Sequence, residues 1–217
     1  MGRVSAATTH EDGRARAGRR GERERDHREG DDVSAPILFL DIDGVLNDNA
    51  WITAACAGQS AITSWSLDLA RRCLDPARCA RLQRVCGYTF ASLVIVSGWR
   101  RWATVEEIAD ALRGAGLTSP VIGAVGGLKM SGDLRASATR EWLRDHPEVT
   151  RWCVVDDLVD AWREGRRTSR REGRTQVESY ERVVPAWLVG RAVHPVDGLT
   201  EDDAARVASI LSGEVTT

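Results

Sequence analysis

Three short apolar runs, each followed directly by an acid or a hydroxyl, constrain the fold of this chain more than any other feature. The runs are Ile37–Leu40, residues 93–96 and Trp152–Val155, and they are followed by Asp41, by Ser97 and by the pair Asp156 and Asp157. Four apolar residues without polar alternation are typical of a parallel strand that is buried on both faces. Residues 121–122 and residues 187–193, which Gly190 interrupts, are weaker strand candidates.

Helical signals separate the expected strands. One helix should begin at Pro76, behind the capping residue Asp75, and end at Gly87. Thr104 and Glu107 have the spacing of a capping box for the next helix, which Gly114 should end. Further helices are expected over residues 136–145 and 200–211. Strands that alternate with helices predict an α/β fold with a doubly wound parallel sheet.

Composition indicates the domain organisation. Residues 1–34 contain eight arginines, eight acids and few large apolar side chains, so we predict a disordered charged tail before one folded domain over residues 35–217. The chain has no run of about 18 apolar residues and its N-terminus is charged, which predicts a cytoplasmic protein without a membrane span or a secretory signal. The net charge of −2 neither requires nor excludes a nucleic-acid partner, and the oligomeric state stays open.

Acidic side chains follow two of the expected strands. The carboxyl ends of parallel strands share one edge of the sheet, and ligands bind in the crevice there. Asp41 and Asp43 are two residues apart, so strand geometry would place them on one face. Converging carboxylates repel each other unless a cation lies between them, and hard oxygen ligands suit Mg²⁺. With Asp156 and Asp157 from another strand, these four acids are the predicted Mg²⁺ ligands. An isolated Asp-x-Asp is commonly a solvated turn, but acids at two strand ends are harder to explain in that way.

The segment Asp41-Ile-Asp-Gly-Val resembles the first motif of the haloacid dehalogenase (HAD) superfamily, which is an apolar strand that ends in Asp-x-Asp. The order of the following features is similar as well: a strand ending in Ser or Thr, then a basic residue, then a strand ending in an acidic pair. Together these motifs span residues 36–160. The resemblance implies a HAD-like fold and an enzyme that is a phosphatase or phosphotransferase, because dehalogenases of the superfamily lack the second acid, here Asp43.

The resemblance also implies roles for the matching residues. Asp41 would attack phosphorus and form an aspartyl phosphate, and Asp43 would protonate the leaving group and later activate water. Ser97 would donate a hydrogen bond to the transferring phosphoryl group. One of Asp156 and Asp157 would bind Mg²⁺ directly and the other through water.

The basic residue of the third motif has three candidates. Lys129 is the only lysine among 30 basic residues, and its compact charge differs from an arginine fork, which favours it as a catalytic residue. Arg135 and Arg140 lie nearer the helix expected at residues 136–145 and are the alternatives. Arg135 is also a candidate for substrate binding.

Motif spacing bears on access to the site. Asp43 and Ser97 are separated by 53 residues, and Ser97 and Lys129 by 31, which leaves no room for a full cap domain beside the expected helices. A capless or minimally capped site would be open to a phosphate on a large substrate such as a nucleic-acid end or a protein. Capless members of the superfamily also act on small metabolites.

Two features favour nucleic acid as the carrier of the phosphate. Residues 97–102 place aromatic and cationic side chains beside the expected phosphate site, which makes Gly98, Trp99 and Arg100 candidate substrate-binding residues where bases could stack. Packing of Trp99 or Trp102 in the core is an equally good interpretation. Residues 163–174 contain six arginines and two glutamates, which suits a clamp on a phosphodiester backbone or, equally, a solvated loop.

The Ser-Gly-Trp-Arg segment, the Asp41 motif as far as Asn47 and residues 198–202 are similar to the HAD domain of bacterial Swiss Army Knife RNA-repair proteins, which resembles polynucleotide phosphatases. We therefore expect an Mg²⁺-dependent phosphomonoester hydrolase whose substrates include nucleic-acid ends or nucleotides. A small-metabolite phosphatase and a catalytically idle phosphate-binding module are the alternatives.

Overall fold

The computed structural model describes residues 34–55, 66–125, 132–162, 164–172, 175–183 and 185–214. For residues 67, 132 and 133 and for the strands between 164 and 183, only the backbone is described. Contacts divide the chain into two units, Met1–Asp32 and Val33–Thr217, and all described residues belong to the second. The tail predicted for residues 1–34 lies outside the described residues, apart from Ser34.

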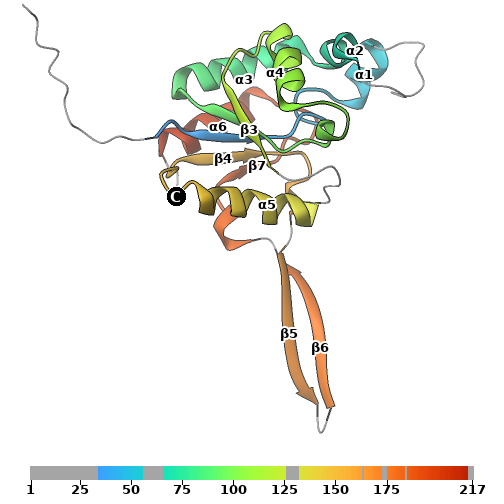
Figure 1. Ribbon diagram of the computed structural model, residues 1–217, viewed down its shortest axis with the longest axis vertical. Coiled ribbons are helices and arrows are strands. Elements are labelled where there is room, and N and C mark those ends of the chain that lie inside the picture. The colour runs from blue at the N-terminus through green and yellow to red at the C-terminus, as the bar shows by residue number, and fades with distance from the viewer. Residues whose placement is uncertain are drawn as a thin grey trace, which may run out of the picture. The chain divides into compact units, whose positions relative to one another are not determined.

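Five parallel strands form the central sheet in the order β3–β2–β1–β4–β7 (Figure 1). The strands are β1 (Ile37–Leu40), β2 (Ser92–Ile95), β3 (Val121–Ala124), β4 (Trp152–Val155) and β7 (Ala192–Val193). All four pairings between neighbouring strands are parallel. This arrangement confirms the doubly wound α/β fold that the apolar runs predict.

Six α-helices and three 3₁₀ helices connect the strands in the described part of the chain. They are α1 (Asn49–Ala55), α2 (Leu67–Cys73), α3 (Pro76–Thr89), η1 (Gly98–Arg101), α4 (Val105–Gly114), α5 (Gly132–Asp145), η2 (Val159–Ala161), η3 (Ala186–Leu188) and α6 (Glu201–Ser212). The predicted cap at Asp75 and the capping box of Thr104 with Glu107 are both present. No helix in the described ranges is long and apolar enough to cross a membrane.

Each face of the sheet carries its own apolar layer. Successive β1 side chains alternate between the faces, so Leu38 and Leu40 join one buried cluster while Ile37 and Phe39 join the other. The first cluster includes residues of α2, α3, α4 and α6, and the second includes Ala136 of α5. Figure 1 shows α3 and α4 on one side of the sheet and α5 on the other. Strands covered on both faces explain why the sequence shows continuous apolar runs.

Three expected boundaries are wrong. Helix α3 runs past Gly87 and ends where Phe90 takes a left-handed φ of 58°. Helix α5 begins at Gly132, four residues before the expected start at 136. Most of residues 187–193 is not a strand, because η3 and a turn at Gly190, with a φ of +72°, come before the two residues that pair with β4.

The arginine-rich segment forms a strand. Backbone from Glu164 to Glu172 (β5) pairs antiparallel with Thr175–Val183 (β6) in a two-stranded sheet separate from the central one. The expectation of a solvated loop is therefore wrong over β5. Arginine has no strong strand preference of its own, and strand formation depends on cross-strand partners that local composition does not reveal.

Candidate active site

Strand register brings the predicted acids to one edge of the sheet. Leu40 pairs with Ile95 on one side and with Val155 on the other, so Asp41 leaves the sheet between the ends of β2 and β4. The Asp41 N–H continues the ladder by donating to the Val155 carbonyl at 2.9 Å. Asp156, the next residue after β4, is therefore the neighbour of Asp41.

Three carboxylates converge at this edge. Asp41, Asp156 and Asp157 each offer an oxygen, and these oxygens lie within 4.8 Å of one another. Asp41 is 2% exposed and Asp156 is fully buried. Asp43 is not part of this cluster, because the chain has left the strand and entered a turn by that residue, so the two-residue strand period no longer applies.

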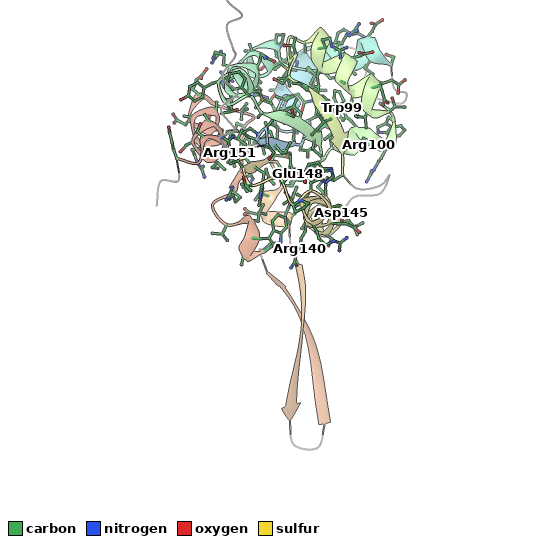
Figure 2. The ribbon with its side chains drawn as sticks, turned by 60° about the vertical axis from the view of Figure 1, so that its left-hand side comes forward. Trp99, Arg100, Arg140, Asp145, Glu148 and Arg151 are labelled. Atoms are coloured by element: carbon green, nitrogen blue, oxygen red, sulfur yellow. The ribbon has the colours of Figure 1, made fainter. Side chains whose placement is uncertain are left out.

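Arg135 of α5 is the basic residue that reaches these acids in the described structure. Its Nη1 forms ion pairs with Oδ2 of Asp41 and with Oδ2 of Asp156, and the side chain is buried. Lys129, the favoured candidate for this position, lies outside the described residues. Arg140 is exposed and lies well apart from Trp99 and Arg100 in Figure 2.

The electrostatics favour additional positive charge. Burial raises the pKa of Asp41 to about 7, with a contribution in the same direction from the charge of Asp156, and the Arg135 guanidinium opposes both effects. Burial and then the charge of Asp156 also raise the pKa of Asp157. One guanidinium does not offset three clustered acids. Carboxylate oxygens are the ligands that Mg²⁺ takes in proteins, so the donor set of Asp41, Asp156 and Asp157 fits this ion.

Asp43 is held by two side-chain donors. Its Oδ1 accepts hydrogen bonds from Trp99 Nε1 at 2.9 Å and from Asn47 Nδ2 at 3.1 Å. Trp99 is only 6% exposed, so it packs in the core. The sequence analysis gave Asn47 no role in the site, although this residue ends the motif that resembles the RNA-repair HAD domain.

Ser97 follows the end of β2. Its Oγ accepts the backbone N–H of Trp99 at 3.3 Å, which caps η1. A hydroxyl that accepts one hydrogen bond still carries a hydrogen to donate, so this cap is compatible with the donor role predicted for Ser97.

A cleft of about 620 Å³ opens over these residues. It is lined by Asp41, Asp43, Gly44, Asn47, Asp48, Asn49, Ala50, Ile52, Gly98, Arg135, Asp157, Leu158, Val196, Asp197 and Gly198. Of the three predicted substrate-binding residues in the Gly98–Arg100 stretch, only Gly98 lines it. The cleft thus joins the predicted nucleophile, its acid partner and Arg135 in one open space.

A family model described as the HAD domain in Swiss Army Knife RNA repair proteins matches residues 37–180. The chain belongs to this family. Membership of the HAD domain family indicates a hydrolase of the phosphatase type, and HAD proteins generally use Mg²⁺. Comparison with curated proteins and comparison with solved structures gave no match.

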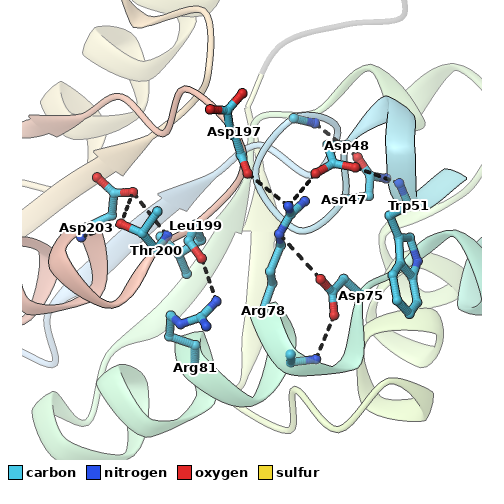
Figure 3. A network of polar contacts seen from close by, with 12 residues as sticks. Asn47, Asp48, Trp51, Asp75, Arg78, Arg81, Asp197, Leu199, Thr200 and Asp203 are labelled. Atoms are coloured by element: carbon cyan, nitrogen blue, oxygen red, sulfur yellow. Dashed lines mark hydrogen bonds and ion pairs between the residues drawn. The ribbon is translucent and has the colours of Figure 1, made fainter.

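One wall of the cleft in this HAD domain comes from residues 196–198, which lie beyond the matched range. Arg78 of α3 holds this wall in place: it donates to the Asp197 carbonyl at 2.8 Å and pairs with Asp48 (Figure 3). Arg81 donates to the Leu199 carbonyl at 2.6 Å. The network therefore ties α3, the segment after β1 and the C-terminal wall together.

Replacing Gly44 with alanine should disturb the HAD domain's acid cluster. Gly44 has a φ of +77°, and a Cβ there would lie 2.2 Å from Oδ2 of Asp157. Asp157 must then move, and we expect Mg²⁺ affinity to fall by at least roughly tenfold. The unfolding temperature, measured at increasing Mg²⁺ concentrations, would give the Mg²⁺ affinity of each variant.

Gly116→Ala is the matched control. Gly116 has a φ of +90°, but a Cβ at this position would have no neighbouring atom within 4 Å, so the variant introduces backbone strain without a collision. Equal losses of Mg²⁺ affinity in the two variants would contradict the role given to the Gly44–Asp157 contact.

Proposed function

We propose that this HAD domain is an Mg²⁺-dependent phosphomonoester hydrolase that works through a phosphorylated Asp41. The observation that carries the proposal is the position of Asp41, which is buried beside Asp156, paired with Arg135 and open to a cleft that also reaches Asp43. A buried acid whose pKa is raised by its surroundings, in a cleft with other acids, is typical of a catalytic group.

In the first step, a carboxylate oxygen of Asp41 attacks phosphorus while the bond to the ester oxygen breaks. Asp43 gives its proton to the departing oxygen, so the alcohol leaves neutral. Because Oδ1 of Asp43 already accepts two N–H groups, its Oδ2 is the oxygen that can carry this proton.

In the second step, the ionised Asp43 accepts a proton from water as that water attacks the phosphorus of the aspartyl phosphate. Inorganic phosphate leaves, and both carboxyl groups return to their starting states. Asp41, Asp156 and Asp157 would hold Mg²⁺, which when bound supplies positive charge against the charge that develops on the phosphoryl oxygens. The ion pairs of Arg135 hold the carboxylates of Asp41 and Asp156 in position through both steps. Ser97 would donate a hydrogen bond to the phosphoryl group.

The family description supplies the first substrates to test. It names RNA repair, and the cleft is open, so we propose phosphorylated ends of RNA or nucleotides as the substrate class. The arginine-rich strand β5 is a further candidate contact for a phosphodiester backbone.

The deciding experiment measures phosphate release from an aryl phosphate, from glycerol phosphate and from 5′- and 3′-phosphorylated oligonucleotides. We expect turnover with Mg²⁺ and loss of turnover when a chelator removes it, with recovery when Mg²⁺ is restored. Turnover that persists undiminished in the chelator would contradict the proposal, as would the absence of phosphate release from every compound.

A further inference from the structure

A second, smaller hollow lies beside the catalytic cleft. It measures about 220 Å³ and is lined by Asp43, Leu69, Ala70, Cys73, Gly98, Trp99, Arg101 and Trp102. Asp43 and Gly98 line both spaces, whereas Asp41 and Arg135 line only the larger one. This smaller space, the side hollow, therefore adjoins Asp43, the proposed proton donor, and not Asp41, the proposed nucleophile.

The lining of the side hollow suits a flat apolar ring. Leu69, Ala70 and Cys73 of α2 are buried and form an apolar surface. Trp102, by contrast, is 60% exposed, and Arg101 is also exposed. Indole and guanidinium groups both stack on nucleobases, and such stacking tolerates any base.

The volume of the side hollow is sufficient for one ring system. An apolar cavity of about 150 Å³ in another protein holds benzene, and this hollow is larger and open on one side. A ring seated against Trp102 would remove apolar surface of both partners from water, which is favourable.

The position of the side hollow matches the path of the leaving group. In phosphoryl transfer the attacking and leaving oxygens lie roughly in line on opposite sides of phosphorus. With Asp41 as the nucleophile, the ester oxygen must face away from it and towards Asp43, whose proton it takes. The alcohol half of the substrate then extends from the catalytic cleft past Asp43, where the side hollow begins.

We propose that the side hollow binds the nucleobase of a substrate whose phosphate is attached to the adjoining ribose. This inference rests on the proposed function, because it uses the roles of Asp41 and Asp43. It adds Trp102 and Arg101 to the candidate substrate-binding residues.

Two phosphate esters that differ only in the base test the inference. We expect kcat/KM for a nucleoside 5′-monophosphate to exceed that for ribose 5-phosphate by roughly tenfold or more, since stacking contributes that much per base. Trp102→Ala should reduce this ratio to near one. Tyr88→Ala is the matched control, because Tyr88 is 69% exposed on α3 and lines neither space, so the ratio should not change.

A binding measurement separates the two proposals. Adenosine, which has no phosphate, should bind the parent protein in calorimetry and should bind Trp102→Ala at least about tenfold more weakly. Absence of adenosine binding to the parent, or equal binding to both proteins, overturns the assignment of the hollow even when phosphate release is normal. Adenosine binding without any phosphate release would support the hollow and overturn the proposed hydrolysis.

Substrates of different length show whether the base belongs to a nucleic-acid end or to a free nucleotide. A higher kcat/KM for a phosphorylated oligonucleotide than for the mononucleotide assigns the hollow to a nucleic-acid end, and equal values assign it to a free nucleotide. If ribose 5-phosphate and the nucleotide are hydrolysed with equal kcat/KM, the base does not enter the hollow.

Discussion

Asp41→Asn should lower kcat for phosphate release by at least about a thousandfold. An amide oxygen is a poor nucleophile and cannot form the acyl phosphate that water then cleaves. The fold should survive, because the change removes one of three crowded acids while Arg135 keeps its ion pair with Asp156. Steady-state phosphate release would give kcat, and circular dichroism would check the fold.

The chemistry of Asp41 can also be observed directly. Parent protein denatured by acid during turnover should carry phosphate on the peptide that contains Asp41, and hydroxylamine should remove it because acyl phosphates react with that nucleophile. Asp110→Asn is a suitable control, since Asp110 is exposed on α4 and pairs locally with Arg113. Turnover by Asp41→Asn at a parent-like rate would rule out the covalent route.

Arg135→Met should destabilise the metal-free protein by about 3 kcal/mol, because it leaves two buried carboxylates without their ion-pair partner. Mg²⁺ should then raise the unfolding temperature more in this variant than in the parent, since the ion can offset the charge that the guanidinium no longer balances. Chemical denaturation and thermal unfolding, each with and without Mg²⁺, would measure both effects.

Arg140→Met serves as the comparison on the same helix. Arg140 is exposed, so its replacement should change the free energy of unfolding by no more than about 0.5 kcal/mol. A larger loss of stability and of kcat/KM in Arg140→Met than in Arg135→Met would show that the basic residue of the site had been assigned to the wrong position on α5.

The central sheet could be predicted because its strands are buried on both faces. Continuous apolar runs such as Ile37–Leu40 are typical of such strands, and the polar residue after each run marks the edge where the site forms. The acids at 41, 156 and 157 follow from that rule alone. The place of Asp43 could not be predicted from the same rule, because its contacts with Trp99 and Asn47 depend on a turn that a strand pattern does not describe.

Other features could not be predicted, for physical reasons. The choice between Lys129, Arg135 and Arg140 could not be made from the sequence, because only the packing of α5 shows that Arg135 contacts the acids, and Lys129 lies outside the described residues. Trp99 lies in η1 and Trp102 directly follows it. The sequence does not distinguish the two tryptophans, yet Trp99 is buried and Trp102 is exposed. Strand β5 forms because its backbone pairs with β6, a partner that arginine content does not indicate.

The match to the HAD family ends inside β6, but the structure that shapes the site continues. Strand β7 pairs with β4, and the Asp156 N–H donates to the Val193 carbonyl at 3.3 Å. A chain shortened to residue 180 would leave β4 as an open sheet edge directly beside that acid and would lack α6 and the residue 196–198 wall. We therefore expect a piece that ends where the family match ends to fold poorly, and expression boundaries for this chain should be placed after α6.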